Sequence, residues 1–179
     1  MHLSDDIRTG RLDFMLLLPV KTRFLISFRH VDLGGFFNAG SALAVMFYAG
    51  AQLKLEPTAA QVAGFLVLIA GAILLHYSLM LILASTSFWT VRAQGVVWAY
   101  YNLFNIARLP DAAFQGLFKV FFTYAVPMLL VANVPVKLLA QRLDHPGEIL
   151  LLLALCGACF VASELVWRLS LRHYTSASS

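Results

Sequence analysis

Residues 62–84 read VAGFLVLIAGAILLHYSLMLILA, and this stretch decides the fold class. A helix needs about 20 mainly apolar residues to cross the hydrocarbon core of a bilayer. The charge-free run around this stretch extends from Thr58 to Val91, and His76 is its only histidine. We therefore predict a transmembrane helix over 58–86, which is tilted or continues past the membrane because the run exceeds the required length.

The composition of the whole chain agrees with a membrane protein. Of its 179 residues, 60% are hydrophobic and 12% are charged, and the mean hydropathy is +0.79. A soluble domain typically has about 25% charged residues, so lipid must solvate much of this surface. The net charge of +4 does not indicate nucleic-acid binding, because the Lys and Arg residues lie mostly between the apolar runs.

Three further apolar runs complete a predicted all-α integral membrane bundle of about four transmembrane helices. The expected spans are about 34–53, 58–86, 115–134 and 148–167. Pro127 lies inside the third run and predicts a kink, because proline removes one backbone hydrogen bond. Residues 92–108 mix aromatic and amide side chains, which predicts an interfacial amphipathic helix along a membrane face.

These runs divide the chain into three parts. The parts are a cytoplasmic or interfacial segment at 1–33, a membrane domain at 34–173 and a cytoplasmic tail at 174–179. The first part should contain a short amphipathic helix, since Leu12, Met15 and Leu16 recur at helical spacing between Gly10 and Pro19. From the residues alone, this helix either lies on the membrane surface or docks a partner.

The Lys and Arg residues predict the orientation, because they are enriched in the cytoplasmic loops of membrane proteins. With four spans, both termini and the middle loop share one side, which carries ten of these residues against three on the other. The ten are Arg8, Arg11, Lys21, Arg23, Arg29, Arg92, Arg108, Lys119, Arg168 and Arg172, and the three are Lys54, Lys137 and Arg142. We therefore expect a multi-pass protein with both termini in the cytoplasm.

The sequence offers no catalytic constellation. The spans contain no carboxylate pair, no HExxH or GxSxG motif and no histidine cluster for a metal. Cys156 and Cys159 lie three residues apart in an apolar run and are interpreted as small packing residues. The phosphate-binding loop GxxxxGK(S/T) is also absent, so ATP binding of that kind requires a separate subunit. We expect no catalytic residue, cofactor or metal site in this chain.

Two ionisable residues are expected at membrane depth. His76 is either a functional residue or a neutral imidazole that is hydrogen-bonded to a neighbouring helix. Glu164 precedes Arg168 by four residues, which is the favourable order for a helical ion pair. A structural pair near the cytoplasmic interface is therefore the simpler interpretation of Glu164.

Short motifs recur along the chain in a fixed order. Gly10 to Val20 fits the pattern G-x-L-D-x-x-L-x-x-P-V. The later motifs are Ala84-Ser85, Ser87-Phe88-Trp89, Arg108-Leu109-Pro110, Phe122 to Pro127, Val134-Pro135 and the closing Leu171 to Ser176. As a set they resemble the bacterial ABC transporter permeases of the type-2 exporter class, in which the first pattern is cytoplasmic and precedes the third of six membrane helices.

The resemblance implies a permease of the bacterial inner membrane that pairs with an identical or different permease chain. It also implies a separate ABC ATP-binding subunit, which would hold ATP and magnesium. The residues implied to dock that subunit are Gly10, Leu12, Asp13, Met15, Leu16 and Pro19, with secondary cytoplasmic contacts at Phe88, Trp89, Arg92, Arg108 and Pro110.

One feature departs from the family pattern, and one alternative stays open. Since family members usually have six spans, this chain is expected to begin just before the third and to lack the first two. The alternative function is that of a membrane scaffold or accessory protein that performs no transport. No span carries a charge pattern that indicates a particular transported substrate.

Overall fold

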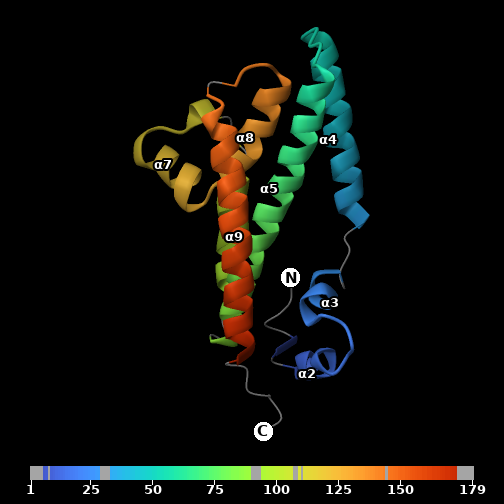
Figure 1. Ribbon diagram of the computed structural model, residues 1–179, viewed down its shortest axis with the longest axis vertical. Helices are drawn as coiled ribbons and strands as arrows, with labels where there is room; N and C mark the ends of the chain where they lie inside the picture. The colour runs from blue at the N-terminus through green and yellow to red at the C-terminus, as the bar shows by residue number, and fades with distance from the viewer. Residues whose placement is uncertain are drawn as a thin grey trace.

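The computed structural model describes residues 6–7, 9–28, 33–89, 94–106, 109, 111–143 and 145–172. Within these residues every regular element is a helix, which confirms the predicted all-α class. Two long helices, α5 (Ala59–Ser85) and α9 (Gly147–Arg172), lie side by side along the molecule (Figure 1). They run parallel, because Gly71 meets Cys156 near the middle of both helices and Tyr77 lies level with Ser163 and Glu164 further along both.

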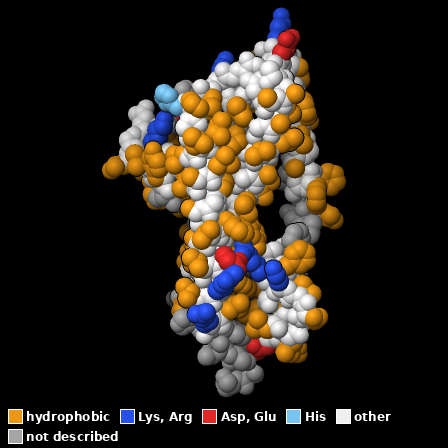
Figure 2. Space-filling model, viewed as in Figure 1, with side chains coloured by type: hydrophobic (Ala, Val, Ile, Leu, Met, Phe, Trp, Pro, Cys, Tyr) orange, Lys and Arg blue, Asp and Glu red, His pale blue; other side chains and the backbone are white. Residues whose placement is uncertain are grey.

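Three helices in the described part of the chain are long and apolar enough to cross a membrane. They are α4 (Leu33–Gln52), α5 together with the 3-10 turn η1 (Thr86–Phe88), and α9. Figure 2 shows hydrophobic side chains over the upper half of the visible face, with Lys and Arg side chains along its upper left edge and at the upper tip, and a further group of charged side chains in the lower half. The chain is therefore a multi-pass membrane protein.

Local sequence explains why α5 begins and ends where it does. Thr58 and Gln61 form a capping box, in which the Thr58 hydroxyl accepts from the Gln61 backbone and the Gln61 side chain accepts from the Thr58 backbone at 2.8 Å. This arrangement satisfies backbone donors that a helix start leaves without partners. At the other end the Ser85 and Thr86 hydroxyls donate to carbonyls one turn earlier. The helix therefore covers nearly all of the predicted span at 58–86.

Small residues allow close packing in the centre of the bundle. A Cβ atom at Gly71 would meet the Cys156 sulfur at 3.4 Å, and that thiol donates a hydrogen bond to the Gly71 carbonyl at 3.0 Å. A Cβ atom at Gly64 would meet the Leu138 side chain at 2.9 Å, where α8 (Met128–Leu139) packs against α5. Close approach at small residues is the usual way for membrane helices to associate.

The predicted third span, 115–134, is more sharply broken than we expected. It consists of α7 (Gly116–Val120), a π-helical turn η3 (Phe121–Ala125) and α8. The helices on the two sides of the break meet at 83°, at the Val126–Pro127 step that was predicted as a kink. The predicted kink at Pro127 is therefore present as a break between two short helices, which form either a broken span or a re-entrant loop.

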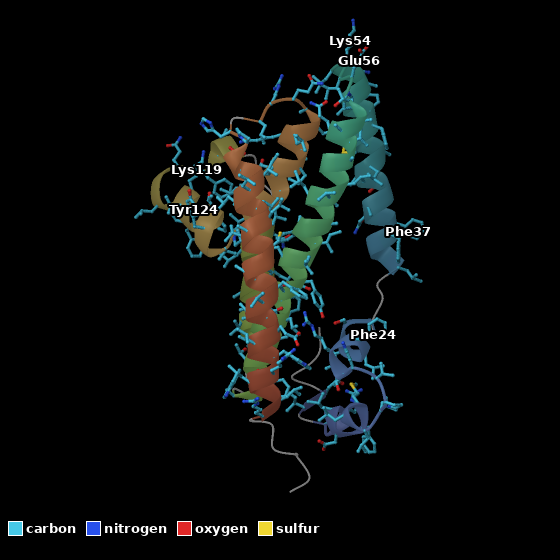
Figure 3. All side chains as sticks on the ribbon, viewed as in Figure 1. Phe24, Phe37, Lys54, Glu56, Lys119 and Tyr124 are labelled. Atoms are coloured by element: carbon cyan, nitrogen blue, oxygen red, sulfur yellow. The ribbon has the colours of Figure 1, made fainter. Side chains whose placement is uncertain are left out.

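The position of Lys119 bears on the predicted topology. The charge count placed Lys119 and Lys137 on opposite sides of the membrane, but both line one cavity of about 320 Å³ together with His145 and Glu148. Figure 3 shows Lys119 in the upper half of the molecule, away from α2 and α3. Lys119 therefore lies at the end of the molecule where α8 ends and α9 begins, away from α2 and α3, and the side of the membrane on which it lies stays a prediction.

The predicted interfacial helix corresponds to α6 (Gln94–Ile106), which packs on α5. It follows the end of α5 closely in sequence, and Tyr100 and Phe104 reach back to His76. Hence α6 runs antiparallel along α5 and leads through the 3-10 turn η2 (Asp111–Ala113) to α7. Its position at a lipid interface stays a prediction.

The remaining helices lie outside this central group. None of the residues of α4 is buried (Figure 3 labels Phe37 on this helix), whereas α5, α8 and α9 contain the main apolar core. The two short helices α2 (Arg11–Leu16) and α3 (Thr22–Phe28) lie at the lower end in Figure 1, close to the end of α9. Helix α4 begins at Leu33, one residue before the predicted membrane domain at 34–173, whose limits stay a prediction.

Candidate functional site

Gly10 and Pro19 set the limits of α2. Gly10 has a φ of 68°, a left-handed conformation that glycine adopts without the steric cost of a side chain. Its carbonyl accepts from the Asp13 backbone at 3.2 Å and so starts the helix. Pro19 disfavours helical geometry at the residue before it, and α2 ends at Leu16. These two residues of the sequence pattern therefore act on the backbone.

The two sides of α2 have opposite environments. Leu12 is fully buried and Met15 is 8% exposed, whereas Phe14 is 74% and Leu17 81% exposed. Burying a leucine side chain completely contributes about 1.5–3 kcal/mol of stability. One side of the helix therefore attaches it to the protein, while the other presents large apolar side chains to the surroundings.

An apolar layer joins α2 and α3 to the lower ends of α5 and α9. Its buried members are Leu12, Met15, Ile26, Leu81, Ala84 and Trp167. Phe88 packs edge-on against Trp167, with ring centroids 5.8 Å apart. This layer, called the apolar layer below, attaches the buried side of α2 to the bundle.

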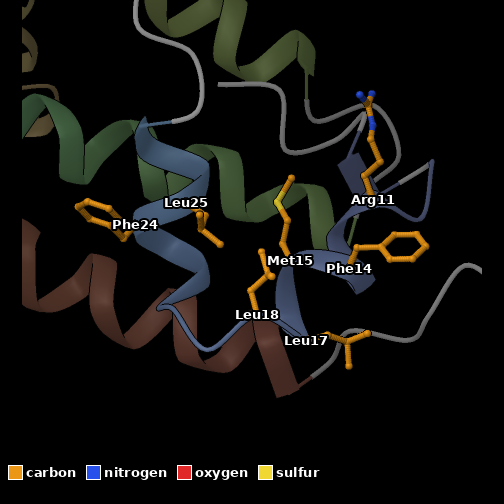
Figure 4. Close-up of a pocket in the computed structure, with 7 residues that line it drawn as sticks. All are labelled: Arg11, Phe14, Met15, Leu17, Leu18, Phe24 and Leu25. Atoms are coloured by element: carbon orange, nitrogen blue, oxygen red, sulfur yellow. The ribbon is translucent and has the colours of Figure 1, made fainter.

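Between α2 and α3 lies a cleft of about 740 Å³ (Figure 4). It is lined by Arg11, Phe14, Met15, Leu17, Leu18, Phe24 and Leu25. Met15, Leu18 and Leu25 lie between the two helices, while Phe14 and Leu17 project away from them (Figure 4). The lining provides no nucleophile and no acid–base pair. Its chemistry suits an apolar side chain or acyl chain, and Arg11 at its edge is already paired with Asp6 at 3.5 Å and Thr9 at 3.0 Å.

The structure divides the predicted docking residues into two groups. Leu12 and Met15 are buried within the chain and Asp13 is half-buried, whereas Leu16 and Pro19 are exposed. Sequence reasoning missed Phe14 and Leu17, which project away from the two helices, and Leu18, which lies between them and is 51% exposed. Their signal was available, because three large apolar residues lie opposite the Leu12–Met15 stripe of a helix too short to span a membrane.

The predicted secondary contacts are only partly described. Phe88 is half-buried in contact with Trp167, and Trp89 is 53% exposed beside it. Arg92, Arg108 and Pro110 lie outside the described residues. Of this group, Trp89 is therefore the one described side chain with a large exposed surface at the lower end.

A polar cluster connects α3 to both long helices; we call it the polar clasp, made of Arg23, Ser27, Tyr77, Ser163 and Glu164. The Arg23 guanidinium forms a salt bridge with Glu164, donates to the Tyr77 hydroxyl at 3.1 Å and reaches the Ser163 hydroxyl at 3.5 Å. The Ser27 and Tyr77 hydroxyls lie 2.8 Å apart. Arg23 also lies over the Tyr77 ring, 5.3 Å from its centroid.

Glu164 is shared between two arginines. The predicted pair with Arg168 is present, with Nε donating to one carboxylate oxygen at 2.8 Å, while Arg23 holds the other oxygen. Charge-assisted hydrogen bonds of this kind are stronger and more directional than neutral ones. The sequence analysis missed Arg23 as a partner because 141 residues separate it from Glu164. The spacing of Arg23 and Ser27 by four residues marks a polar side of α3 that pointed to such a contact.

His76 contacts aromatic residues of α6. Its Nδ1 atom and the Tyr100 hydroxyl lie 3.0 Å apart, and its ring lies 4.7 Å from that of Phe104. The first of these contacts matches the hydrogen-bonded imidazole that was one of the two predicted interpretations. Among the described residues, no group of three or more His, Cys, Asp or Glu side chains is placed to hold a metal ion.

Comparison with known proteins agrees with this arrangement of apolar helices. The family model described as ABC-2 family transporter protein matches residues 1–178. No curated protein and no solved structure matches the chain. Since the family match covers nearly the whole sequence, the chain belongs to the ABC-2 family of transporter proteins.

Proposed function

We propose that this chain is a membrane-spanning permease subunit of an ATP-driven exporter and that a separate ATP-binding subunit docks on the outward side of α2. The observation that supports this most directly is the exposed apolar surface of Phe14, Leu17 and Leu18. A soluble partner that covers these side chains removes them from water, which favours association. The apolar layer holds the buried side of α2 against the bundle, so a docked partner would contact a helix that is fixed to the rest of the chain.

The nucleotide chemistry belongs to the partner in this proposal. The sequence contains no phosphate-binding loop, so ATP and magnesium would be bound by the docked subunit. The Lys and Arg residues near α2, α3 and the end of α9 support a cytoplasmic location for this end of the molecule. Both termini would then be cytoplasmic, in the inner membrane of a bacterium.

The helix α4 supports a further part of the proposal, the pairing with a second permease chain. It is apolar enough to span a membrane, yet none of its residues is buried. Gly35, Gly40 and Gly50 have nothing within 4 Å of an added Cβ atom, which leaves room for another helix to approach closely. The translocation path would lie between the two chains.

Co-purification tests the docking surface. The chain is co-expressed with the ATP-binding subunit encoded beside it, and the double variant Phe14→Asp, Leu17→Asp is compared with wild type. We expect the subunit to be lost from the variant, since two carboxylates replace the apolar contact. Leu169→Asp on α9, where the native side chain is 49% exposed, is the matched control and should retain the subunit.

Two results would argue against the proposal. Retention of the subunit by a monodisperse double variant would mean that these side chains contact lipid or another element. Absence of the subunit from wild type would favour the alternative function, a scaffold or accessory protein without a transport cycle.

A further inference from the structure

The polar clasp joins three elements that are far apart in sequence. Arg23 and Ser27 come from α3, Tyr77 from α5, and Ser163 and Glu164 from α9. Among them, Arg23 contacts both long helices at once. The clasp lies beside the apolar layer, so within the described residues both an apolar and a polar cluster attach the α2–α3 unit to the bundle.

These two contacts constrain the α2–α3 unit differently. Apolar packing is non-directional, so the side chains of the apolar layer permit small sliding movements. A guanidinium presents several donors in a planar fork, and its bonds to Glu164 and Tyr77 fix direction as well as distance. Arg23 is therefore the residue that sets the orientation of α3 relative to α5 and α9.

The neighbouring transmembrane helix makes a different contribution. Although α4 follows α3 in sequence, none of its residues is buried, and the strong contacts of α3 are those with α5 and α9. A displacement of α2 and α3 is thus transmitted to the two packed helices of the core. Sequence order alone would have suggested transmission through α4.

We infer that Arg23 is a positioning residue that couples the cleft between α2 and α3 to the bundle. Through its contacts, α2, α3 and the lower halves of α5 and α9 move as one body. This inference rests on the proposed function for its consequence, because the force to be transmitted comes from a docked ATP-binding subunit. The physical tie itself concerns this chain alone. The two can therefore be tested separately.

The clasp offers a variant that removes every contact of Arg23 without leaving Glu164 unpaired, while the Ser27–Tyr77 contact remains. In Arg23→Ala, Glu164 keeps its bond to Arg168, Ser163 still donates to the Phe160 carbonyl, and the penalty of an unpaired carboxylate is avoided. Arg168→Ala is the matched control, because it also removes an arginine from Glu164 but leaves the α3 contact in place.

The first measurement is the distance between spin labels on the α2–α3 unit and on α9. Lys21→Cys and Leu165→Cys, both at exposed positions, are labelled in the full chain in lipid nanodiscs, with Cys156 and Cys159 replaced by Ala. We expect one narrow distance distribution in wild type and in Arg168→Ala. In Arg23→Ala the distribution should broaden and shift to longer distances. A distribution that stays as narrow as that of wild type overturns the inference.

The second measurement uses the complex with the co-expressed ATP-binding subunit. Labels at Lys54→Cys and Arg142→Cys, exposed positions at the upper end, report the change on trapping with ATP and vanadate. In Arg23→Ala the subunit should remain bound while the trapping-dependent shift is lost, and in Arg168→Ala the shift should persist. A full shift in Arg23→Ala overturns coupling through this residue.

Two further outcomes are decisive. If no ATP-binding subunit co-purifies with wild type, the proposed function fails, whereas the first measurement still decides whether Arg23 ties the α2–α3 unit to the bundle.

If Arg23→Ala does not fold, Arg23→Lys and Tyr77→Phe replace it. Lysine keeps the charge but lacks the fork, and phenylalanine removes the hydroxyl to which Arg23 donates. An unbroadened distribution in both variants overturns the inference.

Discussion

At the scale of single residues, Leu12 and Leu17 show how one short helix serves two purposes. They lie five residues apart, Leu12 in the first turn of α2 and Leu17 directly after its last residue, yet one is fully buried in the apolar layer and the other is 81% exposed. A leucine side chain therefore contributes to folding stability at position 12 and to the exposed apolar surface at position 17. Their exposure, rather than their chemistry, determines the difference.

This contrast predicts unequal effects of the same truncation. Leu12→Ala should lower the stability of the detergent-purified chain by about 2–5 kcal/mol, because it leaves a cavity in a packed site. Leu17→Ala should change it by less than about 0.5 kcal/mol. Thermal denaturation followed by tryptophan fluorescence compares the two midpoints. Equal midpoints in the two variants would show that α2 is not attached through Leu12.

The candidate site could be predicted from the sequence only in outline. The pattern from Gly10 to Pro19 located the correct segment, because glycine and proline act locally on the backbone. Which side of α2 faces outward depends on Leu81, Ala84 and Trp167, residues that are distant in sequence. Periodicity shows that a helix has an apolar side but not whether another element covers it. For this reason the buried Leu12 was predicted as a docking residue and the exposed Phe14 was not.

At the scale of elements, the packing of α8 on α5 depends on a glycine. A Cβ atom at Gly64 would come within 2.9 Å of the Leu138 side chain, whereas one at Gly157 on α9 would have nothing within 4 Å. Both glycines lie inside long apolar helices, so they differ in packing rather than in helix propensity. They form a matched pair for mutation.

We expect Gly64→Val to destabilise the chain by about 1–3 kcal/mol, because a branched side chain forces α8 away from α5. Gly157→Val changes helix propensity in the same way but should leave the thermal midpoint near that of wild type. The midpoints are compared by size-exclusion chromatography after heating in detergent. A larger loss at Gly157 than at Gly64 would contradict the packing of α8 on α5.

The helices themselves were largely predictable, while their arrangement was not. The ends of α4 and α5 and the start of α9 lie within one residue of the predicted spans, which rest on the local requirement for about 20 apolar residues, whereas α9 continues to Arg172, beyond the predicted end at 167. The break between η3 and α8 was recognisable at Pro127, but the 83° angle results from packing of Phe122, Met128 and Leu129 with residues of α5 and α6. Hydropathy counts apolar residues and contains no information on whether a run crosses the membrane or doubles back.

At the scale of the whole molecule, the position of Lys119 connects the fold with the orientation in the membrane. If Lys119 is assigned to the side of Lys137, the side of the termini carries nine Lys and Arg residues instead of ten, and the opposite side carries four instead of three. The side of the termini still carries more Lys and Arg residues than the other side. The enrichment of these residues in cytoplasmic loops therefore still assigns the α2–α3 end to the cytoplasm. The side of the membrane on which Lys119 lies therefore distinguishes the fold described here from a simple four-span topology.

Single cysteines labelled in intact cells test this orientation. On a background without Cys156 and Cys159, a membrane-impermeant maleimide should label Arg142→Cys and Lys119→Cys from outside, and Lys21→Cys only after permeabilisation. Labelling of Lys119→Cys only after permeabilisation would restore the simple topology and contradict the shared cavity with Lys137. Labelling of Lys21→Cys from outside would place the docking cleft where no cytoplasmic ATP-binding subunit can reach it, and the proposed function would then fail together with the orientation.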